Sequence, residues 1–169
     1  ANLVDLVIPT DAENLHVVPP DQALDKTEAA LNSRIGKEFI LREQIEVARS
    51  HYDVILIDCP PSLGTLTLNA LSMAQEVYVP MQAHFLAMQG FSKLLETVGE
   101  VCRNGVNVNL KVSGVILCMH EKHSTLVREV VGELDGFFEE NRGSPLLSND
   151  ARVLRPAIRK NIKLAEAPS

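Results

Sequence analysis

The sequence has few cysteines, no long apolar run and no excess of basic residues. Its three cysteines, Cys59, Cys102 and Cys118, are odd in number and widely spaced, and no Cys-x-x-Cys pair occurs. This usage predicts neither a disulfide framework nor a zinc site, and it fits a reducing cytoplasm. No apolar run approaches the roughly 20 residues of a membrane span. The formal net charge of -6 argues against a protein that coats nucleic acid with its whole surface.

The chain has the length and composition of one globular domain. It contains 169 residues, of which 46% are apolar and 22% charged, so a sizeable core is expected within a single domain over residues 1–169. A basic and apolar leader is absent from the start. Because the chain opens with Ala1 rather than Met and stops at Ser169 within a motif, we expect it to be a piece of a longer protein.

The stretch around Asp58 carries the clearest functional signal. Val54–Ile57 is a run of branched apolar residues, which predicts a strand covered on both faces. Asp58 then lies at the carboxyl edge of the sheet, where open α/β folds bind ligands. Pro60 and Pro61 stiffen the exit loop, and Gly64 permits unusual backbone geometry. The alternative is a purely structural role, in which Asp58 only caps a turn.

Strands and helices are expected to alternate along the chain. The predicted strands cover residues 15–20, 54–57, 76–80 and 112–118, and the predicted helices cover 21–34, 37–50, 65–74, 88–103 and 124–141. We expect Thr65 to cap the third of these helices. This order predicts an α/β fold with a mostly parallel sheet, helices on both faces and right-handed crossovers.

The segment Asp58-Cys59-Pro60-Pro61-Ser62-Leu63-Gly64, after its apolar run, resembles the second switch of the ParA/Soj/MinD group of deviant Walker ATPases. The resemblance implies a P-loop NTPase-like fold that binds ATP and magnesium. It implies that Asp58 acts in catalysis by holding magnesium, directly or through water. It also implies that Pro60 and Pro61 contact the nucleotide, and that residues 60–64 report the γ phosphate to a dimer face.

Two further segments carry the resemblance. Residues 80–90 are similar to the family's Pro-x-Gln-x-Glu-x-x-x-x-Gly, with His84 and Gln89 where acids are common. Residues 158–169 are similar to Ile-Pro-Arg-Asn-x-Arg-Leu-x-Glu-Ala-Pro-Ser, with Arg159 in place of Pro. That segment lies beside the adenine base in the family, which implies nucleotide contacts for a set of residues near the end of the chain: Asn161, Glu166, Ala167 and Pro168. About ten residues within 141–156 look like an insertion.

Residues 119–123 admit alternatives. By its loose alignment with the family's Met-x-Asp-x-Arg-Thr, Met119 borders the adenine site, or else it packs in the core. The same alignment puts His123 in place of a basic residue that faces DNA. His120 and His123 are closely spaced, but one acid and no distant partner accompany them, so we do not predict a metal site there.

The segment from Arg152 to Lys163 holds five basic residues and no acid. It forms a solvated face, a patch that faces DNA phosphates, or a contact for an acidic protein. The resemblance favours DNA, since the family binds DNA without sequence preference through basic side chains. The predicted DNA-binding residues are Arg155, Arg159, Lys160 and Lys163.

The family's phosphate-binding sequence, Lys-Gly-Gly-x-Gly-Lys-[Ser/Thr], is absent, as is its first switch with Asp-x-Asp-Pro-Gln. We expect both before Ala1 in an intact member, and we expect this chain alone to be inactive. The resemblance implies a cytoplasmic, nucleoid-associated homodimer that hydrolyses ATP slowly when a ParB-like partner engages it. The alternatives are a non-catalytic binding module, a MinD-like ATPase that cycles on membranes, and an amidotransferase relative of the cobyrinic acid synthase kind.

Overall fold

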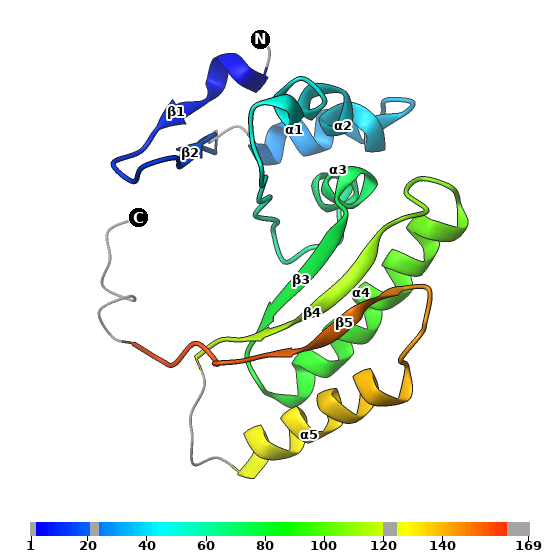
Figure 1. Cartoon of the computed structure of the whole chain (residues 1–169). Helices are drawn as coiled ribbons and strands as arrows, with labels where there is room; N and C mark the ends of the chain where they lie inside the picture. Colours follow the sequence, from blue (N-terminus) through cyan, green and yellow to red (C-terminus); the bar gives the residue numbers. More distant parts are fainter. Residues whose placement is uncertain (1–2, 21–23, 120–124, 162–169) are drawn as a thin grey trace. The chain divides into compact units, whose positions relative to one another are not determined.

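The computed structural model describes residues 3–20, 24–119 and 125–161 (Figure 1). The chain divides into two compact units, Ala1–Met73 and Ala74–Ser169. Whether both belong to the single predicted domain stays a prediction.

The second unit contains a parallel sheet in the order β3-β4-β5, with strands Glu76–Met81, Lys111–Leu117 and Leu147–Leu154. Helix α4, Phe85–Arg103, connects the first two strands, and helix α5, Thr125–Glu140, connects the last two (Figure 1). A sheet of parallel strands joined by helices confirms the predicted α/β class.

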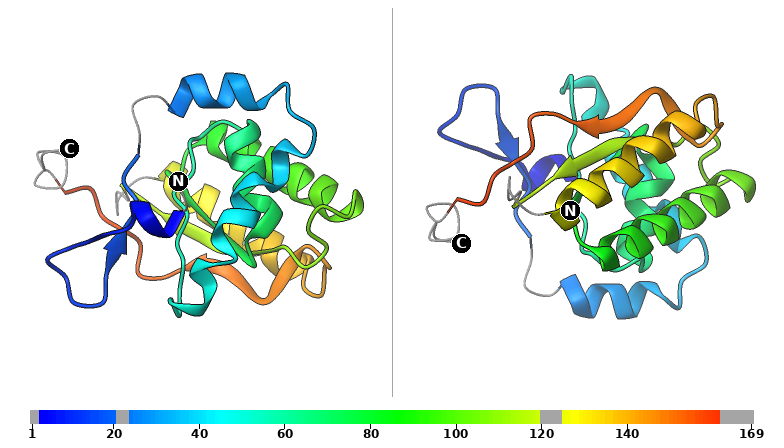
Figure 2. Two further views of the ribbon diagram at one scale, coloured as in Figure 1. Left: turned by 90° about the horizontal axis from the view of Figure 1, so that it is seen from above. Right: turned by 90° about the horizontal axis from the view of Figure 1, so that it is seen from below.

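Buried apolar side chains of α4, β4 and α5 form the core of this unit. The described side chains with 0 or 1% exposure include one on α4, one before β4, three on β4 and one on α5: Val98, Leu110, Val112, Val115, Leu117 and Leu134. The rings of Phe91 on α4 and Phe137 on α5 meet edge to face, with centroids 5.5 Å apart. The two helices therefore lie side by side (Figure 2), as the repeat of apolar residues in each predicts.

Strand β5 occupies much of the range 141–156, where the insertion expected from the sequence stays a prediction. It includes Ser148, Asn149 and Asp150, residues with low or moderate strand propensity, so the sequence did not indicate a strand. Pairing with β4 overrides that propensity, and Gly114 allows the close approach. A Cβ atom at Gly114 would overlap the Arg152 carbonyl oxygen and a methyl group of Leu154.

The first unit is less regular. Its short elements are the 3-10 helix η1 (Leu3–Leu6), the antiparallel pair β1 (Ile8–Pro9) and β2 (His16–Val17), and the helices α1 (Leu24–Leu31), η2 (Lys37–Phe39), α2 (Ile40–Ile45), η3 (Ala48–Ser50) and α3 (Thr65–Met73). Helix α3 matches its prediction closely. The predicted strand over 15–20 is two residues long, and the predicted helix over 21–34 is observed over α1.

The helix predicted over 37–50 is broken into three pieces, and at the first break a side chain enters its hydrogen-bond ladder. In a continuous α-helix, the amide of Leu41 would donate to the carbonyl of Lys37. Instead the Leu41 amide donates to Asn69 Oδ1 at 3.0 Å, and Asn69 Nδ2 donates to the Lys37 carbonyl at 2.7 Å. The buried amide of α3 thus replaces one helical bond and separates η2 from the rest.

The strand predicted over Val54–Ile57 is wrong. The segment has no sheet pairing, and Val54 and Leu56 are 72% and 89% exposed. A strand requires a neighbour for its backbone N–H and C=O groups, and no segment among the described residues pairs with this one. The segment is therefore apolar but largely exposed. It leads to Asp58 without regular secondary structure.

Candidate functional site

Asp58 lines a pocket of about 450 Å³ in the first unit. The pocket is formed by one residue of α1, the loop before α3 and one residue of the first turn of α3: Glu28, Asp58, Cys59, Pro60, Pro61, Ser62 and Leu66. The side chain of Asp58 is exposed, so water and ions can reach it. The predicted residues Asp58, Pro60 and Pro61 therefore lie together around one cavity.

The loop is tied to the start of α3 by side-chain hydrogen bonds. Thr67 Oγ1 donates to the Ser62 carbonyl at 2.6 Å, and Thr65 Oγ1 donates to Asn32 Oδ1 at 2.5 Å. The predicted capping by Thr65 is wrong, because the Gly64 carbonyl accepts from the Leu68 amide and Thr65 is already the first residue of the helix. The Glu28 carboxylate instead accepts from the Leu66 amide at 3.3 Å. A residue 38 positions away thus satisfies a helix N-terminal N–H.

The thiol of Cys59 is a weaker acid than an ordinary cysteine thiol, because its pKa is raised. Desolvation by its surroundings, followed by the negative charge of Asp58, raises its pKa above the ordinary value. A raised pKa keeps the thiol protonated near neutral pH, so Cys59 lacks the thiolate character of a reactive cysteine.

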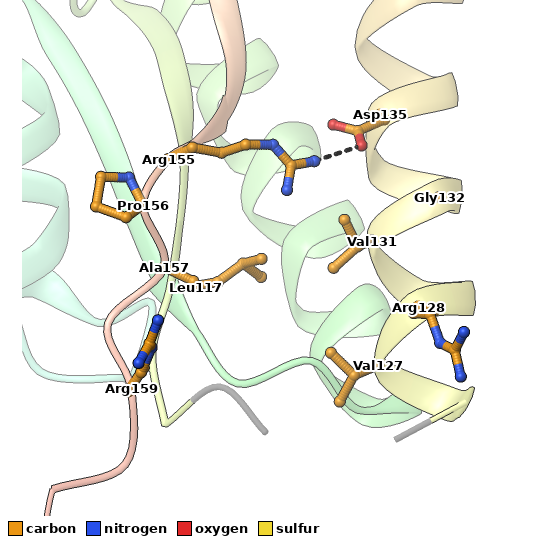
Figure 3. Close-up of a pocket in the computed structure, with 10 residues that line it drawn as sticks. All are labelled: Leu117, Val127, Arg128, Val131, Gly132, Asp135, Arg155, Pro156, Ala157 and Arg159. Atoms are coloured by element: carbon orange, nitrogen blue, oxygen red, sulfur yellow. Dashed lines mark hydrogen bonds and ion pairs between the residues drawn. The ribbon is translucent and has the colours of Figure 1, made fainter. Parts of the chain in front are cut away.

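A second pocket, also of about 450 Å³, lies in the other unit between α5 and the segment after β5 (Figure 3). Leu117, Val127 and Val131 give it an apolar wall. The Ile158 amide donates to the Leu117 carbonyl at 2.8 Å, which holds the segment with Arg159 beside the end of β4. Arg159 faces the pocket from this segment, whereas Arg128, which sequence analysis did not single out, lines it from α5.

Arg155 differs from the other predicted basic residues. Its guanidinium lies 2.9 Å from Asp135 of α5, with the two side chains 63% and 46% exposed (Figure 3). An exposed pair of this kind contributes at most about 1 kcal/mol and can reopen at low cost. Arg152 is exposed on β5, and Arg159 and Lys160 are exposed after it.

The predicted adenine residues are only partly described. Met119 lies two residues after the end of β4 with its side chain 57% exposed, so the alternative of core packing is wrong. Gln82 Nε2 donates to its sulfur at 2.8 Å. Asn161 is exposed at the end of the described chain. Several predictions lie outside the described residues: those for Lys163, Glu166, Ala167, Pro168, and the His120–His123 segment.

The described residues contain neither a cluster of metal ligands nor a helix that could cross a membrane. In residues 3–20, 24–119 and 125–161, no group of three or more His, Cys, Asp or Glu side chains is arranged to hold a metal ion. No helix in the described part of the chain combines the length and apolarity needed to cross a bilayer.

Comparison with known proteins defines the family. The family model described as an AAA domain matches residues 1–112, so the chain belongs to this family. Within it, the chain is related to ParA and Soj. It is 36% identical over 169 residues to the sporulation initiation inhibitor protein Soj of Bacillus subtilis, covering 100% of this chain and 62% of that protein. It is 35% identical over 165 residues to the chromosome partitioning protein ParA of Myxococcus xanthus. That match covers 98% of this chain and 54% of that protein.

A solved structure shares the fold. Cobyrinic acid a,c-diamide synthase from Mycobacterium smegmatis, crystallised with an ATP analogue and magnesium, superposes with a TM-score of 0.77 and 31% identity, over 96% of this chain and 61% of that one. The recognised relationship to ParA and Soj is confirmed. The chain spans 54 to 62% of the length of these relatives.

Proposed function

We propose that the protein is an ATP-dependent partitioning switch that binds ATP and magnesium and hydrolyses ATP slowly. The observation that carries the proposal is the loop Asp58-Cys59-Pro60-Pro61-Ser62-Leu63-Gly64 around an open pocket, in a chain related to partitioning ATPases. The proposal further assigns both units of the chain to one ATPase domain.

The Asp58 pocket suits magnesium held by few protein ligands. Magnesium keeps several waters and binds through one or two carboxylates together with phosphate oxygens. Asp58 offers an exposed carboxylate on the pocket, whereas one oxygen of Glu28 is already bonded to the Leu66 amide. Asp58 would therefore hold the ion, directly or through water. Bound magnesium would neutralise charge on the phosphates.

The remaining nucleotide contacts are inferred from the family. Pro60 and Pro61 line the pocket beside Asp58 and are proposed to face the phosphates. Roles at the adenine are proposed for Met119, Asn161, Glu166, Ala167 and Pro168. No Lys-Gly-Gly-x-Gly-Lys sequence occurs in the chain, so we propose that a longer polypeptide supplies the phosphate-binding loop and that this chain alone is inactive.

Partners are proposed on the same grounds. An ATP-bound homodimer would associate with DNA without sequence preference, meet a ParB-like protein, and reside in the cytoplasm on the nucleoid. Arg159, Lys160 and Lys163 are proposed to contact DNA phosphates. Arg155 would join them only after its ion pair with Asp135 opens.

The first experiment measures ATP turnover by the full-length protein with and without DNA. We expect slow, magnesium-dependent turnover that DNA increases, and a loss of at least tenfold in Asp58→Ala, because the ion would lose its protein carboxylate. Asp53→Ala is a matched control, since Asp53 is exposed at the other end of the same segment and does not line the pocket. Equal turnover by wild type and Asp58→Ala would reject the assigned role of Asp58.

The second experiment tests the DNA surface. Arg159→Glu and Lys163→Glu should each weaken binding to duplex DNA by more than tenfold in a fluorescence anisotropy titration, and wild-type affinity should fall steeply with salt. Lys93→Glu, an identical charge change at an exposed position on α4, should have little effect. Equal losses in all three variants would mean that only net charge matters, and unchanged binding in the first two would reject the surface.

An amidotransferase role is the second candidate, favoured by the structural similarity to cobyrinic acid a,c-diamide synthase. It predicts that cobyrinic acid and glutamine, rather than DNA, accelerate ATP turnover. Parallel assays with each addition distinguish the two functions.

A further inference from the structure

We propose that Glu28 is a positioning residue for the Asp58 loop: its carboxylate holds the first turn of α3 and thereby sets the loop that carries Asp58. Glu28 acts through the Leu66 amide and does not need to touch the nucleotide. The inference rests on the proposed ATPase function for its catalytic consequence, whereas the contact itself is independent of that function.

The Glu28 carboxylate supplies a hydrogen-bond acceptor at the N-terminus of α3. The first N–H groups of any helix lack partners within the helix, and a carboxylate is favoured there because the helix N-terminus carries partial positive charge. Pro60 and Pro61 precede α3, and the side chain of Thr65 is bonded to Asn32. Glu28, half-buried on α1, accepts from the Leu66 amide at 3.3 Å and takes the role that a local capping side chain would have.

Gly64 makes room for this carboxylate. A Cβ atom built on Gly64 would overlap Glu28 Oε1, and no other neighbour lies nearer to that position. The φ angle of Gly64 is outside the left-handed range, so space at the carboxylate, rather than backbone conformation, is what this glycine supplies. The end of the switch-like segment and a helix far away in sequence are therefore fitted to each other.

A second bond reinforces the same connection. One turn after Glu28, Asn32 Oδ1 accepts from Thr65 Oγ1, so α1 and the turn that follows it hold two consecutive residues of α3. Thr67 Oγ1 donates to the Ser62 carbonyl, and this bond ties the loop to the helix. Glu28 and Asp58 line the same pocket. Hydrogen bonds therefore connect α1 to the start of α3, and the start of α3 to the loop.

The test compares Glu28→Ala and Glu28→Gln in the full-length protein by two measurements. Hydrogen exchange of the Leu66 amide, followed by NMR, should become about five- to tenfold faster in Glu28→Ala and recover in large part in Glu28→Gln, which keeps an acceptor oxygen. The kcat for ATP should fall by roughly tenfold in Glu28→Ala with a smaller change in KM, because a displaced catalytic group lowers kcat. Glu43→Ala, at an exposed glutamate on α2, is the control.

Gly64→Ala gives an independent variant, because the added methyl group displaces the Glu28 carboxylate without changing it. It should reproduce both effects of Glu28→Ala. Unchanged Leu66 exchange in Glu28→Ala would overturn the contact, and faster exchange with unchanged kcat would overturn the positioning role. If the wild-type protein does not hydrolyse ATP, the proposed function fails, while the exchange result still decides whether Glu28 holds α3.

Discussion

The two units of this chain are stabilised in different ways. Every described apolar side chain with less than 2% exposure belongs to the second unit, whereas most of the exposed large apolar residues belong to the first. The second unit packs two amphipathic helices against a parallel sheet. Among the described residues the first unit buries fewer apolar side chains, such as Ile45 and Leu71, and side-chain hydrogen bonds that involve Glu28, Asn32 and Asn69 add to its stability. A β-α-β arrangement can bury its own apolar surface, but a segment such as 54–57 without a neighbouring strand cannot.

The largest effect is expected in the apolar core of the second unit. Leu134→Ala removes a side chain of α5 that is 0% exposed and should lower the free energy of unfolding by about 3 kcal/mol, because it leaves a cavity. Leu126→Ala on the same helix, at 49% exposure, should cost less than about 0.5 kcal/mol. Urea titrations followed by circular dichroism measure both. Equal losses of unfolding free energy at the two positions would mean that Leu134 does not pack in a buried core.

A smaller effect is expected from the polar contacts of the first unit. Asn69→Ala removes the amide that bonds to Leu41 and Lys37 and leaves two backbone groups unpaired, so it should cost about 1 to 2 kcal/mol. Gln44→Ala on α2, where the side chain makes no hydrogen bond among the described residues, is the control. A cost at Asn69 no larger than that of the control would show that the broken helix does not depend on the inserted amide.

The smallest effect is expected where the first unit exposes apolar residues. Leu56→Ser, at a side chain 89% exposed, should change stability by less than about 0.5 kcal/mol, whereas the milder change Ile45→Val at 4% exposure should cost about 1 kcal/mol. The same urea titration on this 169-residue chain measures both. A loss above about 2 kcal/mol for Leu56→Ser would mean that residues 54–57 are buried after all, and would remove the contrast between the units.

The second unit was predictable because its signals are local. The apolar repeats of α4 and α5 and the short apolar runs of β3 and β4 indicate the correct elements. Strand β5 was not predictable, since Asn149 and Asp150 lie in it only because β4 offers a partner. In the first unit, the same rule for apolar runs failed at Val54–Ile57, where burial requires a neighbour that the described chain does not contain.

The candidate site was predictable in part for a similar reason. Asp58, Pro60 and Pro61 are consecutive enough to be recognised as one motif, and they line one pocket. Glu28 carried no signal, because nothing in an ordinary helical segment marks a glutamate that will bond to an amide 38 residues later. Arg128 and Asp135 were missed on the same grounds, although both line the pocket with Arg155 and Arg159.

Sequence alone was enough for the α/β class, for most helices and strands of Ala74–Ser169 and for the ParA/Soj relationship, because these depend on residue periodicity and on contiguous motifs. Three-dimensional contacts were needed for the break in the helix at Leu41, for the cap that Glu28 places on α3 and for the ion pair of Arg155. Each of these joins residues far apart in the chain, and a polar group takes whichever partner the folded backbone brings within hydrogen-bonding distance.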